Sequence, residues 1–301
     1  MTSKTHQLRT LLQSGEFLYM PSATTPIEGK LAETMGANLV YTGGYATGAS
    51  RAITEPLLTM DEQVRVAGEV ARAVEIPLIA DAGAGFGEPL HTMRTVREFA
   101  AAGVAGIHIE DQLFPKRAHY HKYIAHAVPL PEFVDKIRWA CRERDRTDRD
   151  FVIIARSDTC RELGLDEAVA RVNAAAAVGA DLGLLFPRNG SEAEAAPKQA
   201  KLPLVWVQSR GNRDGRPIYS LAELKAMGYR ACIDAQLLLG VAVHFMKEAL
   251  AEMVQTGRYT GIGDNQFTTL RKEIEDMIGL DTYYEVEAET VEKTETEIHP
   301  V

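Results

Sequence analysis

Residues 106–117 read GIHIEDQLFPKR, a run of apolar residues that ends in charged ones. It opens on the apolar residues Ile107 and Ile109, which is typical of a strand covered on both faces in a parallel sheet. It then runs without a break into two adjacent carboxylates, Glu110 and Asp111. Because buried charge at a strand end is unfavourable unless a cation or a substrate compensates it, the stretch predicts a buried strand that ends at a functional site.

Two further stretches repeat this arrangement of an apolar strand followed by charged groups. Residues 77–87, PLIADAGAGFG, place Asp81 at the end of an apolar run, with glycines behind it. Residues 151–158, FVIIARSD, end in Arg156 and Asp158. Alternating β/α folds keep their chemistry at the carboxyl ends of parallel strands. The three stretches therefore predict one site at that edge of the sheet.

The length and the apolar spacing predict eight strand–helix units. A single (β/α)8 barrel needs about 250 residues, and the chain has 301. The expected strands are residues 17–22, 38–42, 77–81, the start of 106–117, 151–155, 182–187, 204–208 and 230–235. The expected helices are residues 5–15, 26–36, 59–74, 90–102, 131–144, 165–178, 191–200, 221–227 and 237–256, with a long loop from residue 43 to residue 56. A doubly wound open sheet has the same alternation, but the count of eight and the absence of G-x-G-x-x-G after the first strand favour a TIM-type barrel.

The chain is expected to divide into a barrel, residues 1–257, and a C-terminal region, residues 258–301. That region is predicted to be helical around residues 267–278 and then becomes acidic, EVEAETVEKTETE. Acidic segments of this kind are typically solvated or docked on a partner.

The composition points to a cytoplasmic protein with reduced cysteines. Hydrophobic residues make up 46% and charged residues 25% of the chain, as in ordinary globular proteins. No apolar run reaches the roughly 20 residues of a membrane span, and the N-terminus lacks the apolar core of a signal peptide. Cys141, Cys160 and Cys232 are too few and too scattered for a disulfide framework. The net charge of −9 argues against a nucleic-acid partner, but a metal ion or a local arginine still permits an anionic substrate.

Carboxylates at the ends of neighbouring strands suggest a metal site. Asp81, Glu110 and Asp111 have the oxygen-ligand character that Mg²⁺ prefers. The alternative is that each acid caps a helix or pairs with Lys116 and Arg117. The placement of Asp81 and Glu110 on neighbouring strands favours the metal.

Two other strand ends carry groups suited to an anionic oxygen. Arg156 could clamp a substrate carboxylate with its bidentate fork, or it could form a structural ion pair with Glu110 or Asp158. Thr42-Gly43-Gly44 offers backbone N–H groups where no side chain blocks the approach. Alternatively, these glycines serve only the turn.

The loop that follows Arg117 is rich in groups that can move protons. It contains His119, Tyr120 and His121, and imidazoles change charge near neutral pH. The alternative is a solvated surface loop without a catalytic role. The spacing of the two histidines is not that of a zinc-binding pair on a helix. His108, inside the strand of the opening stretch, is expected to be a satisfied core histidine, and the cysteines are expected to be structural.

The segments TGGYATGAS, ADAGAGFG, GIHIEDQLFPKR, DFVIIARSD and IGLDTYYEVE resemble the isocitrate lyase / phosphoenolpyruvate mutase superfamily. The resemblance covers nearly the whole chain. It is strongest to the branch of methylisocitrate lyase, dimethylmalate lyase, oxaloacetate hydrolase and the petal death protein. It implies a (β/α)8 barrel whose C-terminal helix is exchanged with a neighbour, giving a homotetramer built from dimers. It also implies Mg²⁺, with Mn²⁺ as the alternative, and a small 2-oxo or 2-hydroxy dicarboxylic acid that reacts through an enolate.

The chain departs from the family pattern at four positions. The metal motif D-A-D-x-G-[YF]-G has Gly83 in place of its second aspartate. The gate loop K-[KR]-C-G-H has Ala118 where the family carries its catalytic cysteine. The aspartate of L-P-D-L-G is replaced by Glu55, with Thr54 as the next nearest residue, and the glutamate of F-P-E is replaced by Arg188. Fewer acids and an added arginine imply a more positive pocket, and with it either a more anionic substrate or a metal that is held less tightly.

The resemblance and the strand ends together define the candidate residues. The metal ligands are Asp81 and Glu110. The substrate-binding candidates are Tyr41, Thr42, Gly43, Gly44, Arg156, Arg188 and Gln208. The catalytic candidates are His119, Tyr120, His121, Glu55 and Arg156, with the loop residues replacing the missing cysteine as proton donor.

Three functions remain open at this point. The first is a Mg²⁺-dependent carbon–carbon lyase, decarboxylase or hydrolase. The second is a mutase or hydrolase of the phosphonopyruvate type, with Arg188 on the phosphonyl group. The third is a barrel that has lost catalysis and binds a metal or a carboxylate, for which Gly83 and Ala118 argue.

Overall fold

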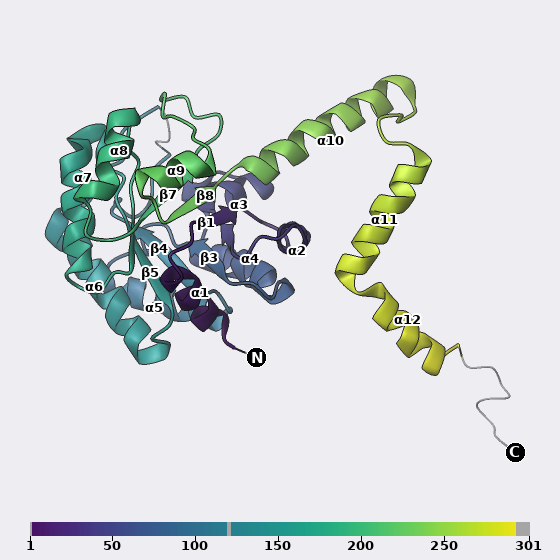
Figure 1. Cartoon of the computed structure of the whole chain (residues 1–301), viewed down its shortest axis with the longest axis horizontal. Coiled ribbons are helices and arrows are strands. Elements are labelled where there is room, and N and C mark those ends of the chain that lie inside the picture. The colour runs from purple at the N-terminus through teal and green to yellow at the C-terminus, as the bar shows by residue number, and fades with distance from the viewer. Residues whose placement is uncertain (1, 119–121, 293–301) are drawn as a thin grey trace, which may run out of the picture. The chain divides into compact units, whose positions relative to one another are not determined.

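Within residues 2–118 and 122–292, which the computed structural model describes, eight parallel strands form one sheet (Figure 1). The strands are β1 (Leu18–Pro21), β2 (Val40–Thr42), β3 (Leu78–Asp81), β4 (Gly106–Glu110), β5 (Val152–Arg156), β6 (Leu182–Leu184), β7 (Leu204–Gln208) and β8 (Ala231–Asp234). The hydrogen-bonded order runs β1-β8-β7-β6-β5-β4-β3-β2. A parallel bridge between Ser22 and Tyr41, with the Ala23 N–H donating to the Tyr41 carbonyl at 2.8 Å, joins the two ends. The predicted TIM-type barrel is therefore confirmed.

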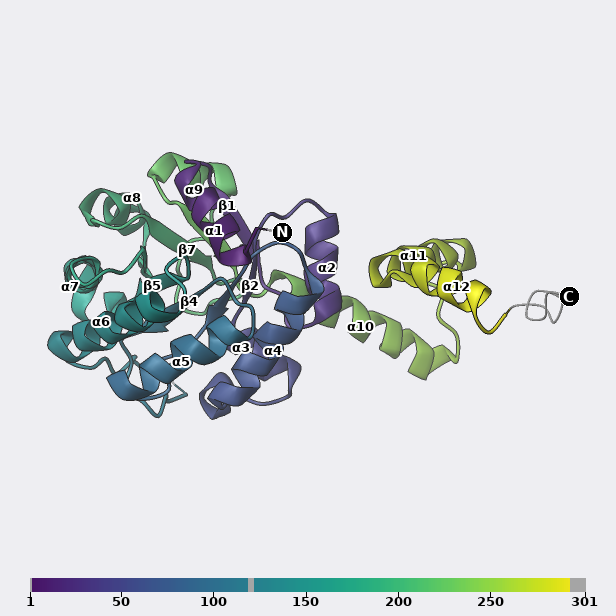
Figure 2. The ribbon, with the colours of Figure 1, turned by 90° about the horizontal axis from the view of Figure 1, so that it is seen from below.

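Helices cover the outside of this barrel (Figure 2). In chain order they are α1 (Lys4–Gln13), α2 (Pro26–Thr34), α3 (Gly44–Ser50), α4 (Met60–Ala73), α5 (Pro89–Ala101), α6 (Leu130–Thr147), α7 (Cys160–Ala176), α8 (Gly190–Gln199) and α9 (Leu221–Met227). Several begin at the caps that the sequence offers. Thr59 and Ser220 each accept from the backbone N–H three residues on, while Glu62 and Glu223 bond back to the cap, which satisfies N–H groups that have no partner inside the helix.

The strand of the opening stretch is buried on both faces, as predicted. Ile107 and Ile109 pack with Phe99 of α5 and Ile137 of α6, in the layer between sheet and helices. Because side chains alternate along a strand, His108 faces the other way, into the barrel. The same alternation puts the charged strand ends at the mouth of the barrel.

Two segments that were expected to lack a helix contain one, while α7 begins five residues earlier and β6 ends three residues earlier than expected. Residues 43–56 were expected to be a loop, but they contain α3 and a 3-10 turn η1 (Glu55–Leu57). The glycines of this segment allow the packing, because a Cβ on Gly48 would lie 2.8 Å from the Glu55 backbone nitrogen. The start of the acidic tail is also helical, since α12 (Leu280–Glu289) follows α11 (Asp264–Ile278) directly. Short helices whose apolar stripe is weak escape a periodicity argument.

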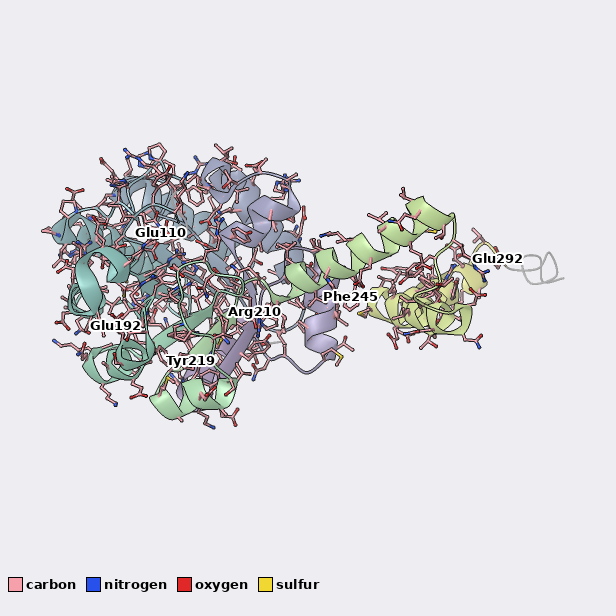
Figure 3. All side chains as sticks on the ribbon, turned by 90° about the horizontal axis from the view of Figure 1, so that it is seen from above. Glu110, Glu192, Arg210, Tyr219, Phe245 and Glu292 are labelled. Carbon is pink, nitrogen blue, oxygen red and sulfur yellow. The ribbon has the colours of Figure 1, made fainter. Side chains whose placement is uncertain are left out.

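The chain divides into two compact units, one ending at Gly240 and one beginning at Val241. The helix α10 (Leu237–Thr256) starts in the first unit and continues into the second. No residue of α10, α11 or α12 is buried in the described chain. Figure 3 shows Phe245 standing out from α10. Among the described residues, no helix is long and apolar enough to cross a membrane.

The tight packing of the central strands predicts the effect of adding one methyl group. A Cβ on Gly106 would lie 2.8 Å from Val152 Cβ and 2.9 Å from the Val152 carbonyl oxygen, where nothing flexible can yield. We expect Gly106→Ala to lower the free energy of unfolding by about 1–3 kcal/mol through overpacking, measured by urea denaturation. Gly240→Ala is the matched control, because its Cβ would meet nothing within 4 Å. Equal stability of the two variants would contradict this packing.

Candidate functional site

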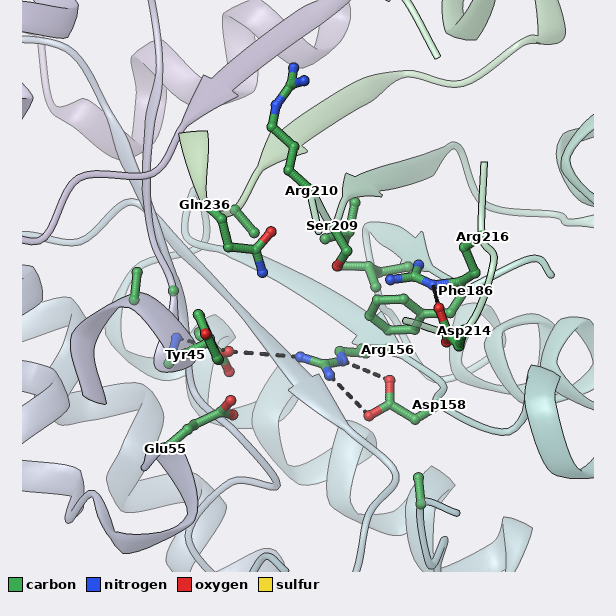
Figure 4. Close-up of a pocket in the computed structure, with 18 of the residues that line it drawn as sticks. Tyr45, Glu55, Arg156, Asp158, Phe186, Ser209, Arg210, Asp214, Arg216 and Gln236 are labelled. Carbon is green, nitrogen blue, oxygen red and sulfur yellow. Dashed lines mark hydrogen bonds and ion pairs between the residues drawn. The ribbon is translucent and has the colours of Figure 1, made fainter. Parts of the chain in front are cut away.

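A cavity of about 490 Å³ lies at the carboxyl ends of the barrel strands (Figure 4). Its described lining includes residues from β2, β3, β4 and β5 and from the segments that follow β6 and β7. The charged lining residues are Glu55, Asp81, Arg156, Asp158, Arg161, Arg188, Arg210, Arg213, Asp214 and Arg216. Two of the three charged strand ends singled out in the sequence, Asp81 and Arg156, therefore line one cavity. Glu110, at the third, is buried behind this lining and lies 3.1 Å from Arg156.

Asp81 ends β3 and presents its carboxylate to the cavity. Its Oδ2 accepts from the Gly44 N–H at 3.1 Å, and its Oδ1 accepts from the Gly83 N–H at 2.8 Å. Burial by itself would raise the pKa of Asp81, but His108 in its protonated form, Arg156 and Lys116 outweigh it and hold that pKa well below its usual range. Asp81 is therefore ionised at neutral pH, and each of its oxygens keeps a second lone pair for another partner.

Glu110 ends β4 and is fully buried between two cations. Its Oε2 lies 3.1 Å from Arg156 Nη2, and its Oε1 lies 3.0 Å from Lys116 Nζ. Lys116 also contacts Glu55 of η1. Burial raises the pKa of Glu110 to about 7 although both cations oppose it. The pairing with Lys116 that the sequence left as an alternative is therefore present, and it ties the loop after β4 to the site.

Arg156 ends β5 and lies among three carboxylates. Its Nε and Nη2 donate to Asp158 at 2.8 and 3.0 Å, and its Nη1 lies 3.7 Å from Asp81 Oδ2. Glu110 is the third carboxylate. Both structural pairings considered for Arg156 are thus present, and its guanidinium nevertheless lines the cavity.

The contact between Tyr41 and His108 is not evident from the sequence. The Tyr41 hydroxyl lies 2.7 Å from His108 Nε2, and the two rings stack. Within the described chain His108 Nδ1 has no hydrogen-bond partner and lies 3.7 Å from Asp81 Oδ1. Burial lowers the pKa of His108 to about 4, so the imidazole is neutral at pH 7. His108 is therefore a cavity residue, and the signal in the sequence was its alternation with Ile107 and Ile109.

The other candidates fall into three groups. Gly43, Gly44, Glu55 and Arg188 line the cavity, and a Cβ on Gly44 would lie 2.8 Å from Glu55. Thr42 and Gln208 are buried and are not among the described residues that line the cavity. The Thr42 hydroxyl donates to the Ala23 carbonyl, and Gln208 accepts from Trp206 Nε1. His119, Tyr120 and His121 lie outside the described residues.

We call the part of the cavity around Asp81 and Arg156 its inner end. The carboxylate oxygens there suit a hard cation such as Mg²⁺. Among the described residues no group of three or more His, Cys, Asp or Glu side chains is placed to enclose a metal. Mg²⁺ does not need such a cage, because one or two carboxylates, waters and substrate oxygens complete its shell. The ionised Asp81 at the cavity wall, with Glu110 on the other side of Arg156, fits that requirement.

Comparison with known proteins places the chain beside enzymes that act on small acids. The family model described as phosphoenolpyruvate phosphomutase matches residues 8–254. The 2,3-dimethylmalate lyase of Eubacterium barkeri is 33% identical over 284 residues, which cover 93% of this chain and 96% of that protein. A structure of oxaloacetate acetylhydrolase with the inhibitor 3,3-difluorooxalacetate matches with a TM-score of 0.87 and 31% identity, over 95% of this chain and 96% of that chain. A structure of phosphonopyruvate hydrolase with oxalate and Mg²⁺ matches with a TM-score of 0.83 and 30% identity, over 96% and 100% of the two chains.

The neutral, buried His108 predicts a dependence of stability on pH. An unfolded histidine takes a proton at about pH 6.5, whereas His108 in the fold resists protonation down to about pH 4. The wild-type protein must therefore lose stability as the pH falls through this window. In His108→Gln this loss is absent, so the variant should gain about 2 kcal/mol relative to wild type between pH 7.5 and pH 5, measured by urea unfolding. His91→Gln, on the exposed face of α5, is the control, and parallel pH profiles for wild type and His108→Gln would contradict the assignment.

Proposed function

Because this chain belongs to the phosphoenolpyruvate phosphomutase family, we propose that it uses Mg²⁺ to break a bond alpha or beta to the carbonyl of a small 2-oxo or 2-hydroxy acid. The chain is an enzyme of the isocitrate lyase / phosphoenolpyruvate mutase type, whose relatives are lyases, decarboxylases and hydrolases of small oxo-acids. The observation that carries the proposal is the ionised Asp81 beside Arg156 on the wall of one cavity. The reaction class among lyase, decarboxylase and hydrolase is the part that an assay must decide.

In the proposed mechanism the inner end of the cavity binds the 2-oxo-carboxylate. Arg156 donates to the substrate carboxylate, and it is already oriented by its two hydrogen bonds to Asp158, so little rotamer freedom is lost on binding. Asp81 and Glu110 would hold Mg²⁺. When bound there, the metal supplies a Lewis acid that stabilises negative charge on the keto oxygen. Gly43 and Gly44 line the same wall, and the Gly44 N–H donates to Asp81 and so helps to orient this carboxylate. Glycine is needed at position 44 because a Cβ there would lie 2.8 Å from Glu55.

A proton donor is also required where the family carries its cysteine. We keep His119, Tyr120 and His121 as the proposed donors, with Glu55 as a candidate that lines the cavity. The Glu55 carboxylate contacts Lys116, so it is held in place beside the inner end. Decarboxylation and hydrolysis need no cysteine acid, which keeps both reactions open beside retro-aldol cleavage.

A phosphonate substrate is the second candidate function. Arg188 occupies the position after Phe186-Pro187 and lines the cavity, and guanidinium groups bind phosphonyl oxygens well. A relative of 35% identity over 212 residues, which cover 68% of this chain and 72% of that protein, is a phosphonopyruvate hydrolase of Variovorax sp.. The third candidate function is that of a barrel that binds these acids without turnover.

A panel of oxaloacetate, methylisocitrate, dimethylmalate and phosphonopyruvate separates these candidates. We expect turnover of at least one 2-oxo or 2-hydroxy carboxylic acid, lost on chelation with EDTA and restored by Mg²⁺. Turnover of phosphonopyruvate alone would favour the second candidate. Activity that EDTA does not change would contradict the proposed metal. Oxalate binding without turnover of any of these acids would favour the third candidate function, a barrel that binds acids without catalysis.

The role proposed for Arg156 predicts that its substitution weakens the binding of oxalate, measured by calorimetry in the presence of Mg²⁺. We expect Arg156→Ala to weaken oxalate binding about 100-fold or more, because a buried charge pair contributes 2–5 kcal/mol or more when one partner is removed. Arg156→Lys, which keeps a charge among the three carboxylates, serves if the alanine variant fails to fold. Arg94→Ala, on the exposed face of α5, is the control. Unchanged oxalate affinity in both Arg156 variants would remove Arg156 from the site.

We also propose that the C-terminal unit docks on a second copy of this chain, in a cytoplasmic homotetramer. Its exposed apolar residues include Val243, Phe245, Met246, Leu250 and Val254 on α10. Large apolar patches of this kind usually mark an interface. The three cysteines are buried and free, which suits a reducing compartment.

The double variant Phe245→Glu, Leu250→Glu tests this interface. Two charges in an apolar contact should reduce the oligomer to a smaller species in analytical ultracentrifugation, because each buried charge would be unpaired. Lys247→Glu changes the charge of the same helix without touching its apolar residues. An unchanged sedimentation coefficient in the double variant would count against docking through α10.

A further inference from the structure

The outer half of the cavity, lined by Arg188, Asp214 and Arg216, carries positive charge that the mechanism proposed for the 2-oxo-carboxylate does not use. Phe186 lies between two guanidinium groups (Figure 4), with Arg156 Cζ 4.9 Å and Arg216 Cζ 4.8 Å from the ring centroid. The two guanidinium carbons are therefore less than 10 Å apart. A ligand only a few carbon atoms long can reach both sides of the ring.

The two sides differ in how their charge is compensated. Arg156 has three carboxylates around it: Asp81, Glu110 and Asp158. On the other side, two arginines face one carboxylate. Arg188 Nη1 donates to Asp214 Oδ2 at 2.7 Å, and Arg216 Nε lies 3.7 Å from Asp214 Oδ1.

Arg216 bears its charge in an unfavourable place. It is 8% exposed, and within the described chain Asp214 is the carboxylate in ion-pair distance of its guanidinium. Burial, together with the nearby charges of Arg188 and Arg156, lowers the pKa of Arg216 although Asp214 and Asp158 oppose this. A desolvated cation with a distant counterion gains from a second anion.

Arg188 and Arg216 both face the cavity rather than the bulk solvent. Arg188 is held there by two contacts to Asp214, the second from Nη2 to the backbone carbonyl at 3.1 Å. The backbone of Arg216 is fixed by Asn212, whose side chain bonds both its N–H and its carbonyl at 3.0 Å. The two guanidinium groups are thus preorganised, which lowers the entropy lost on binding.

We propose that Arg188 and Arg216 form a subsite for a second acidic group of the substrate, a carboxylate or a phosphonate at the end remote from the 2-oxo-carboxylate. The inference rests on the proposed function for the inner end of the cavity. In the free enzyme Asp214 is the internal anion that holds the two arginines, and the substrate's remote acid competes with it. The substrate then lies across Phe186 with one acid on each side, and 2-oxo acids with a single acidic group bind weakly.

Calorimetry in the presence of Mg²⁺ tests the subsite with ligands of two lengths. Oxalate reaches only the inner end, whereas 3,3-difluorooxaloacetate and phosphonopyruvate each carry a remote acid. We expect Arg216→Gln to weaken binding of the two longer ligands by 10- to 100-fold and to leave the oxalate affinity within twofold of wild type. The larger of the two losses identifies the remote acid as a carboxylate or a phosphonate.

The variant Asp214→Asn should change the affinity for the longer ligands in the opposite direction. Removing the internal anion should tighten the binding of the longer ligands several-fold, again without effect on oxalate. If the arginines and Asp214 only hold the segment after β7 in place, this variant should weaken all ligands alike. It also keeps the proposal testable if Arg216→Gln does not fold.

Arg210→Gln is the control for long-range attraction. Arg210 lines the same cavity, but all three of its hydrogen bonds go to Asp234, so its removal should lower the affinity for the longer ligands less than threefold. A loss equal to that of Arg216→Gln would overturn the subsite. An equal effect of Arg216→Gln on oxalate and on the longer ligands would also overturn the subsite. If the wild-type protein does not bind oxalate at all, the function proposed for the inner end is wrong instead.

Discussion

The carboxylates gathered around Arg156 are the constraint on which the rest of the structure depends. Asp81, Glu110 and Asp158 come from two strand ends and the segment after a third, and all three are buried. Removing such charges from water costs several kcal/mol for each ion unless a partner compensates it. The parallel pairing of β3, β4 and β5 as neighbours in the sheet brings the carboxylates together and also supplies the compensating cation from β5. The site and the fold are therefore stabilised by the same set of ion pairs.

The loop after β4 takes part in this compensation through Lys116. The ammonium group is buried with Glu110 and Glu55, which lie 55 residues apart in the chain. Burial would lower the pKa of Lys116, but Glu110 and Glu55 raise it above its ordinary value, so the cation remains charged. Any ligand or metal that draws Glu110 toward the cavity must change this contact. The loop after β4 is thereby coupled electrostatically to the carboxylates at the strand ends.

The cavity is asymmetric in charge, and its departures from the family pattern explain why. The backbone N–H of Gly83, at the position of a family aspartate, donates to Asp81, which fixes the carboxylate without adding charge. Glu55 replaces an aspartate with a longer side chain that reaches Lys116. Arg188 replaces a glutamate and, with Arg216, makes the outer half positive. The side of the cavity around Arg156 is thus rich in carboxylates, and the side around Arg188 and Arg216 is rich in arginines.

The sequence by itself determined the barrel, because parallel strands covered on both faces leave long apolar runs such as those around Ile107 and Ile153, with charge only at their carboxyl ends. It also located Asp81, Glu110 and Arg156 at those ends. It did not reveal the helix α3, whose small residues lack an apolar stripe. Only the tertiary structure decided that His108 faces Tyr41 and Asp81, that Thr42 and Gln208 are turned away from the cavity, and that Arg216 and Phe186 meet. The physical reason is that periodicity along one strand tells which residues share a face, whereas the partners across a site come from segments far apart in the chain and are chosen by packing and charge compensation together.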